Sequence, residues 1–124
     1  MKKIINSTKA PKAIGPYSQA VEVGGTLYIS GQIPVDVVTG KFSDDVAEQT
    51  EQVMKNIGYI LSEAGYNYNN VVKSTIFIKN MNDFATINAI YAKYYTSEMP
   101  ARSTVEVSKL PLGVSVEIET IAVK

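Results

Sequence analysis

The chain has 124 residues, a length typical of one domain with its own apolar core, so residues 1–124 are expected to form a single domain. Twelve lysine and arginine residues balance twelve aspartate and glutamate residues, and a net charge of zero gives no general attraction to nucleic acid or anionic membranes. Cysteine and histidine are absent, which excludes disulfides, thiol nucleophiles, zinc sites built on those ligands and a histidine general base.

The first part of the chain is predicted to form short strands and one irregular loop. The segment ending at Asn6 is a candidate edge strand, and Lys9–Tyr17, with two prolines and a glycine, is either an ordered loop or a disordered arm. Ala20–Val23 and Thr26–Ser30 flank a Gly-Gly pair, which is the pattern of a β-hairpin. No apolar run reaches the length of a signal-peptide core or a transmembrane helix, so we expect a cytoplasmic location and no membrane partner.

Two helices are predicted from apolar residues at helical spacing. The longer helix covers Ser43–Ala64, with Ser43 or Asp44 as its N-terminal cap and Gly65 just beyond its end. The second runs from about Asp83 to Tyr95, with Asn82 as its cap. Their expected buried stripes are, respectively, Val46, Val53, Ile57, Ile60, Leu61 and Ala64, and Phe84, Ile87, Tyr91 and Tyr94.

The remaining segments with alternating apolar residues predict three more strands, over Val71–Lys79, Ser103–Ser108 and Val114–Val123. The element order indicates an α+β fold, in which a largely antiparallel six-stranded sheet carries two helices on one face. The other face of such a sheet needs cover, and in a chain of this size the simplest cover is another copy of the same chain.

Arg102 and Glu117 are the leading candidates for chemistry. Arg102 lies at a strand entrance, where its planar fork would bind a carboxylate through two hydrogen bonds, although a surface or interface salt bridge is the simpler interpretation. Glu117 and Glu119 share one face of a strand, where acidic residues are uncommon. That face is either solvated or lines a polar site in which one carboxyl group accepts a proton from water.

Three further segments carry weaker signals. Tyr17 lies on a stiffened loop and points its hydroxyl group at a ligand or covers the sheet edge with its ring. Ser30 and Gly31 end a strand, where glycine permits close approach of a ligand or another chain, although a simple turn is the favoured interpretation of the pair taken alone. Asn88, a poor helix former within the second helix, either orients a ligand or is an exposed polar residue.

Other kinds of site find no support. The chain has no phosphate-binding glycine loop, no nucleophile elbow and no cluster of metal ligands, so no metal site is expected. No basic stripe accompanies the eight tyrosines, which argues against an RNA-binding surface.

Taken together, these segments resemble the Rid family, also called the YjgF family. The resemblance runs from Asn6 to the C-terminus and rests on Ala13–Ala20, Ser30–Pro34, Asn88–Tyr91, Pro100–Ser103 and Val116–Glu119. It implies a chorismate-mutase-like α+β fold and a homotrimer with three equivalent active sites between subunits. It also implies an imine deaminase that hydrolyses 2-iminobutanoate and 2-iminopropanoate to 2-keto acids and ammonia.

The resemblance also implies roles for individual residues. Arg102 would bind the substrate carboxylate and Glu117 would orient and deprotonate the attacking water, while the pocket would be shaped by Tyr17, Ser30, Gly31 and Asn88. A protonated imine is already electrophilic, so no cofactor is expected. Thr104 stands where many relatives have a cysteine, and a threonine hydroxyl can bind substrate but cannot serve as a thiol.

The spacing of the last two strands bears on how such a site is built. If they formed a simple hairpin around Pro111 and Leu112, Arg102 would lie near Ile121 and several residues from Glu117. A compact site would then take one of the two residues from a second chain.

Two other functions compete with the deaminase. One is a non-catalytic trimer that binds small carboxylates or partner proteins as a regulator or holdase, but relatives lacking deaminase activity usually lack the arginine that is present here as Arg102. The other is an RNA-cleaving inhibitor of translation, which the zero net charge and the absence of histidine disfavour.

Overall fold

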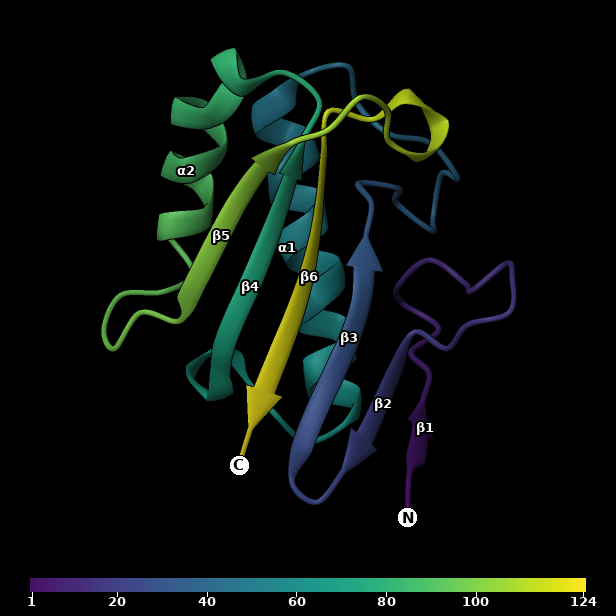
Figure 1. Cartoon of the computed structure of the whole chain (residues 1–124). Helices are drawn as coiled ribbons and strands as arrows, with labels where there is room; N and C mark the ends of the chain where they lie inside the picture. The colour runs from purple at the N-terminus through teal and green to yellow at the C-terminus, as the bar shows by residue number, and fades with distance from the viewer.

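A computed structural model describes residues 1–124, which form six strands and two α-helices (Figure 1). The strands are β1 (Lys3–Ile5), β2 (Ala20–Val23), β3 (Thr26–Gln32), β4 (Val71–Ile78), β5 (Ala101–Glu106) and β6 (Val116–Val123). The helices are α1 (Val46–Glu63) and α2 (Phe84–Ala92), and short 3₁₀ turns occur at Tyr68–Asn70, Met81–Asp83 and Pro111–Gly113.

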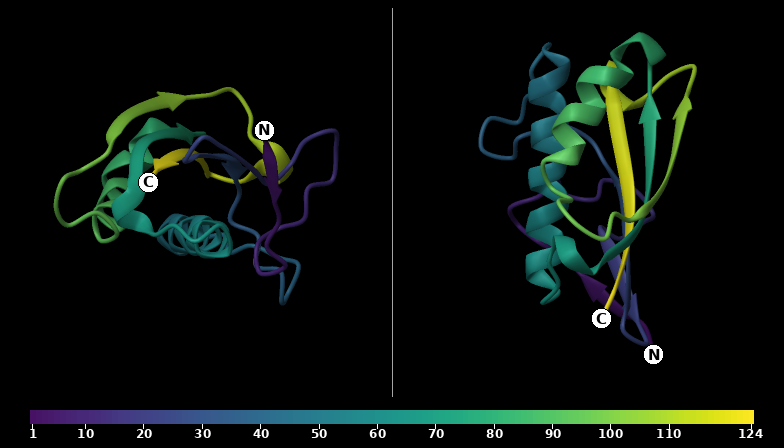
Figure 2. Two further views of the ribbon diagram at one scale, coloured as in Figure 1. Left: turned by 90° about the horizontal axis from the view of Figure 1, so that it is seen from below. Right: turned by 90° about the vertical axis from the view of Figure 1, so that its left-hand side faces the viewer.

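All six strands join one sheet in the order β1-β2-β3-β6-β4-β5. Every neighbouring pair is antiparallel except β4 and β5, which run parallel and are connected through α2. Both helices lie on the same side of the sheet (Figure 2). The predicted α+β fold, with a largely antiparallel six-stranded sheet and two helices on one face, is therefore confirmed.

The simple hairpin considered for the last two strands does not form, because β4 lies between β5 and β6. The burial of the two strands explains this order. In β6, Val116, Ile118 and Ala122 are fully buried, whereas no residue of β5 is buried. The apolar strand takes the centre of the sheet, and the polar one takes the edge, where unpaired backbone groups face water.

The first turn of α1 corrects the predicted cap. Helix α1 begins at Val46, and its cap is Asp45, whose carboxylate accepts the Glu48 backbone N–H at 2.9 Å. Ser43, one of the two predicted caps, instead accepts the Asp45 N–H at 3.0 Å and donates to the Glu48 carboxylate at 2.7 Å. The predicted helix thus began three residues too early, since the polar residues before Asp45 form a capping turn.

Helix α2 is shorter than the predicted Asp83–Tyr95. It covers Phe84–Ala92 and follows a 3₁₀ turn whose cap is Asn80, not Asn82. The Asn80 side chain accepts the backbone N–H of Asn82 at 2.9 Å. The asparagine-rich approach therefore forms a separate turn that sets the direction in which α2 leaves β4.

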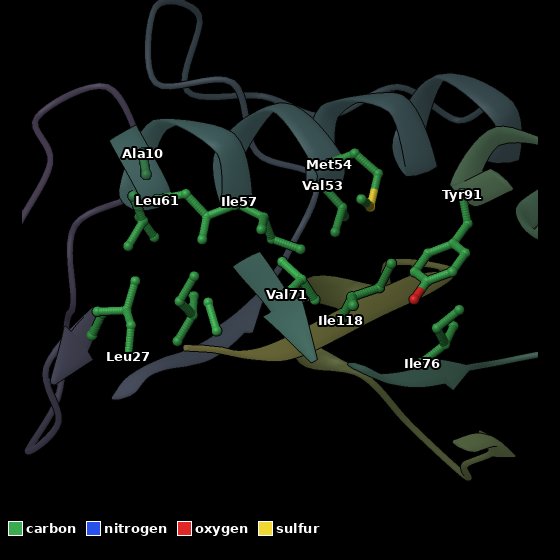
Figure 3. Close-up of a cluster of buried hydrophobic side chains, with 14 of the residues drawn as sticks. Ala10, Leu27, Val53, Met54, Ile57, Leu61, Val71, Ile76, Tyr91 and Ile118 are labelled. Carbon is green, nitrogen blue, oxygen red and sulfur yellow. The ribbon is translucent and has the colours of Figure 1, made fainter. Parts of the chain in front are cut away.

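The core lies between the helices and the sheet (Figure 3). The predicted stripe of α1 is buried at Val53, Ile57, Ile60 and Leu61, and its two ends, Val46 and Ala64, pack against the core from partly buried positions. Of the α2 stripe, Ile87 and Tyr91 are buried, and Phe84 and Tyr94 are partly buried against the same cluster. The periodicity therefore identified the inward face of each helix.

The opposite face of the sheet has no helix over it. Tyr28 on β3 remains 48% exposed there, and Thr75, Glu119 and Ile121 lie beside it on β4 and β6. The sheet is thus covered on one side only, as the sequence predicted.

One buried amide joins α1 to the loop that follows β3. Asn56, fully buried in α1, donates from its side chain to the carbonyl oxygens of Ile33 and Val35, both at 3.0 Å. Its own amide oxygen accepts from Gln52 at 2.9 Å. Because Ile33 and Val35 help line the cavity described below, this residue fixes one wall of the candidate site.

We expect Asn56→Ala to lower the free energy of unfolding by about 2–3 kcal/mol, because two partly buried carbonyl groups lose their donor. Urea unfolding at a fixed protein concentration measures this change. Gln52→Ala is the matched control, since it removes only the bond to Asn56 and should lower the free energy by less than about 1 kcal/mol. Equal losses in the two variants would contradict the role given to the loop contacts.

Candidate active site

The acidic part of the site is built on a bulge in β3. The pairing of β3 with β6 shifts between Ile29 and Gln32, so that Ser30 and Gly31 together face a single residue of β6. At Gly31, a β-carbon would overlap the Glu117 carboxylate and would lie only 2.9 Å from its Cδ. Glycine is therefore required here, because the backbone itself forms the surface against which the carboxylate lies.

The environment of Glu117 raises the pKa of its carboxyl group above the ordinary value of 4.5, chiefly through burial and then through the negative charge of Glu119. Glu117 forms no ion pair, since the one ion pair in the chain joins Lys93 and Glu51 at 3.9 Å. A half-buried carboxylate without a cation is a more effective proton acceptor near neutral pH than an exposed one.

Tyr17 lies close to this bulge, of which Ser30 is a part. The Ser30 hydroxyl donates to the backbone carbonyl of Ser18 at 2.6 Å, which ties the loop before β2 to the end of β3. Tyr17 is 53% exposed, and it lines a largely apolar cavity of about 340 Å³ together with Gly31, Ile14 and others. The Lys9–Tyr17 segment is thus an ordered loop that forms one side of the cavity.

The basic part of the site lies between α2 and β5. Arg102 Nη1 donates to the Asn88 side-chain oxygen at 2.7 Å, and its guanidinium carbon lies 5.6 Å from the ring centre of Phe84 and 5.2 Å from that of Tyr91. Thr104, two residues along β5, has a buried hydroxyl without a hydrogen-bond partner. Asn88 therefore contacts the arginine directly, and one edge of the guanidinium remains free.

The two parts lie on opposite faces of the sheet. Arg102 pairs with Ser74, which is buried on the helix side, whereas Glu117 pairs with Phe77 on the other side. Ser74 also pairs with Thr120, so Glu117 lies three residues further along β6, roughly 10 Å at the rise of a strand, with β4 in between. Although the hairpin does not form, the expected separation of Arg102 from Glu117 within one chain is confirmed.

The structure thus groups Tyr17, Ser30, Gly31 and Glu117 at one place and Asn88, Arg102 and Thr104 at another. Sequence reasoning placed Phe84 and Tyr91 in the core stripe of α2 and missed their contact with Arg102. The signal was present, because Phe84, Asn88 and Tyr91 are spaced to lie on one helix face. No group of three or more carboxylates gathers to hold a metal ion, and no helix has the length and hydropathy of a membrane span.

We expect Glu119→Gln to lower the pKa of Glu117, because it removes the negative charge that opposes ionisation, while burial keeps the pKa above 4.5. Carbon-detected NMR titration of the Glu117 carboxyl group measures the change. Glu63→Gln, at the far end of α1, is a control that should leave the value unchanged. An unchanged or increased pKa in Glu119→Gln would show that the two carboxylates do not interact as their positions indicate.

The chain matches a known protein family over most of its length. The family model described as endoribonuclease L-PSP covers residues 7–124. A curated mouse relative, named 2-iminobutanoate/2-iminopropanoate deaminase, is 50% identical over 100% of this chain and 93% of its own length.

Solved structures agree with this match. A Yersinia pestis protein of unknown function from the Rid family has a TM-score of 0.97 and 51% identity, with complete coverage of both chains. The Escherichia coli protein TdcF, solved with bound serine, has a TM-score of 0.94 and 43% identity over 98% of each chain. These similarities extend over the strands that carry both parts of the site, and the chain belongs to the Rid (YjgF) family, which the endoribonuclease L-PSP model describes.

Proposed function

We propose that the protein hydrolyses small 2-imino acids, such as 2-iminobutanoate and 2-iminopropanoate, to 2-keto acids and ammonia without a cofactor. The observation that carries the proposal is the presence of both an arginine whose outer edge has no partner and a half-buried glutamate without a cation, in a family whose curated relatives include imine deaminases. A relative solved with bound serine supports a ligand of this size with a carboxylate group.

Arg102 would bind the substrate carboxylate. Its guanidinium donates one N–H to Asn88 and has further N–H groups for a bidentate contact. Tyr17, Ser30, Gly31 and Thr104 would complete the pocket around the imine and the short side chain. Holding the anion in one orientation is a large part of the catalysis expected, because the protonated imine is already reactive towards water.

Glu117 would act as the general base. It takes a proton from the attacking water as the water oxygen bonds to the carbon of the protonated imine, which gives a neutral carbinolamine. The protonated Glu117 then gives this proton to the nitrogen, and as the carbon–nitrogen bond breaks, the hydroxyl proton passes back to the Glu117 carboxylate and the keto group forms. The reaction consumes one water and releases ammonia and the 2-keto acid. Because the base must be ionised, kcat/KM should fall as the pH drops through the raised pKa of Glu117.

We further propose that the protein is a homotrimer in which each active site forms between two subunits. A four-carbon substrate cannot bridge the two faces of one sheet, so the arginine of one chain must meet the glutamate of another. The sheet face without a helix and the zero net charge are compatible with such docking. A cytoplasmic setting and the absence of nucleic-acid and membrane partners belong to the same proposal.

An imine-trapping assay tests the function. An oxidase acting on 2-aminobutanoate generates the imine, and semicarbazide traps whatever the protein does not hydrolyse. We expect the wild type to lower the trapping rate and Arg102→Ala to lose about 100-fold in kcat/KM, as when one partner of a charged hydrogen-bonded pair is removed. Arg102→Lys is the matched control, because it keeps the charge without the fork.

If the wild type leaves the trapping of both imines unchanged, the deaminase proposal is wrong. A non-catalytic trimer that binds small carboxylates or partner proteins then becomes the leading function.

Mixed oligomers test where the site forms. We expect Arg102→Ala and Glu117→Gln chains, each inactive alone, to regain about a quarter of wild-type activity when equal amounts assemble at random, since about one inter-subunit site in four is then intact. Glu117→Gln mixed with Glu117→Ala contains no intact site and is the control. Absence of recovery in particles of three 13.5 kDa chains would contradict a site shared between subunits.

A further inference from the structure

Helix α2 presents three side chains to the Arg102 guanidinium. Phe84, Asn88 and Tyr91 lie four and three residues apart, and this spacing puts them on one face of the helix. The two rings lie within 6 Å of the guanidinium carbon, at 5.6 Å and 5.2 Å, which is the range of cation–π attraction. Between them, Asn88 accepts one guanidinium N–H at 2.7 Å. The cation is therefore held by two aromatic faces and one hydrogen bond.

The Tyr91 ring is itself held in place by the core. Tyr91 is only 5% exposed, and its ring packs against Tyr95 with the ring centres 4.8 Å apart. Its hydroxyl group points away from α2 towards the sheet (Figure 3). Burial raises the pKa of this phenol, against smaller lowering effects of the Ser74 hydroxyl and the Arg102 charge, so the ring stays neutral. The Tyr91 face under Arg102 thus belongs to the buried core.

Arg102 itself would otherwise be mobile. Its side chain is exposed and has no ion-pair partner, and a long side chain loses about 2 kcal/mol of rotamer freedom when it is fixed. Where rings and an amide already hold the fork, this ordering happens on folding and does not oppose substrate binding. The contacts come from the helix side, and they leave the outer edge of the guanidinium open for a carboxylate.

We propose that Phe84 and Tyr91 are positioning residues for substrate recognition, whose ring faces hold the Arg102 fork in the orientation that binds the carboxylate of a 2-imino acid. The inference rests on the proposed function and adds to it two residues that never touch the substrate. They act through Arg102.

Paired substitutions at Phe84 test the inference. Phe84→Leu keeps apolar bulk and removes the aromatic face, whereas Phe84→Tyr keeps the face. We expect Phe84→Leu to raise the KM for 2-iminobutanoate about 5- to 10-fold with kcat changed less than about twofold, because the lost contact weakens ground-state and transition-state binding alike. Phe84→Tyr should keep the wild-type KM. At the second ring, we expect Tyr91→Leu to behave as Phe84→Leu does, and Tyr91→Phe to behave as Phe84→Tyr does.

Two measurements distinguish a positioning role of Phe84 from a general loss of structure, and neither depends on turnover of the imine. Calorimetry with 2-oxobutanoate, a 2-keto carboxylate, should show the same 5- to 10-fold weakening in Phe84→Leu, even if the protein hydrolyses no imine. NMR should show that the ring-current shift of the Arg102 side-chain protons decreases in Phe84→Leu and is retained in Phe84→Tyr.

The inference is overturned if Phe84→Leu binds 2-oxobutanoate as the wild type does, or if Phe84→Tyr loses as much affinity as Phe84→Leu. Because Phe84 is only partly buried, this pair remains informative even if Tyr91→Leu fails to fold. If the wild type does not hydrolyse imines but the calorimetric difference between the variants remains, the deaminase proposal is wrong. The proposal that Phe84 and Tyr91 position Arg102 is then retained.

Discussion

Strand β6 joins the two halves of the sheet, and its alternation decides where both charged groups of the site lie. It pairs with β3 on one side and with β4 on the other. Val116, Ile118 and Ala122 are fully buried against the helices, so Glu117 and Glu119 must face the other way. A shift of one residue would expose the apolar set and bury the acids, which fixes the register strongly.

The register of β5 against β4 determines the place of Arg102. Because β5 aligns Arg102 with Ser74, a residue buried on the helix side, the arginine faces α2. Because successive residues of a strand face opposite sides of the sheet, Arg102 and Glu117 lie on opposite faces of the sheet within one chain. No side-chain rotation brings them together, so the proposed chemistry, which needs both, would depend on a second copy of the chain.

Several features of this arrangement could be predicted from the sequence because each depends on local periodicity or on the chemistry of one residue. The apolar stripe of α1, the alternation of β6 and the Gly-Gly hairpin belong to the first kind, and Arg102 and Glu117 to the second. The parallel pairing of β4 with β5 could not be predicted in this way, since it depends on how α2 crosses the sheet. The overlap of a Gly31 side chain with Glu117 depends in turn on a bulge between two strands distant in sequence.

Phe84 and Tyr91 show most clearly what a sequence pattern does not predict. Helical spacing identified them as inward-facing, and both do pack against the core. Their second role follows only from the register of β5, which brings Arg102 under the same helix face. A residue at the border of a core serves packing and function together, and a pattern in one segment reveals only the packing.

The two charged groups differ in a way that suits the proposed assembly. Arg102 remains exposed over its rings, whereas Glu117 is half buried and lacks a cation. In a monomer the arginine has no anion to bind, and the glutamate has no substrate to act on. Docking of two copies would bring opposite charges to one cleft and exclude water from it, and both effects strengthen electrostatic interactions. Assembly and formation of a competent site would then be the same event, and a chain this small would supply what the proposed hydrolysis needs with few residues.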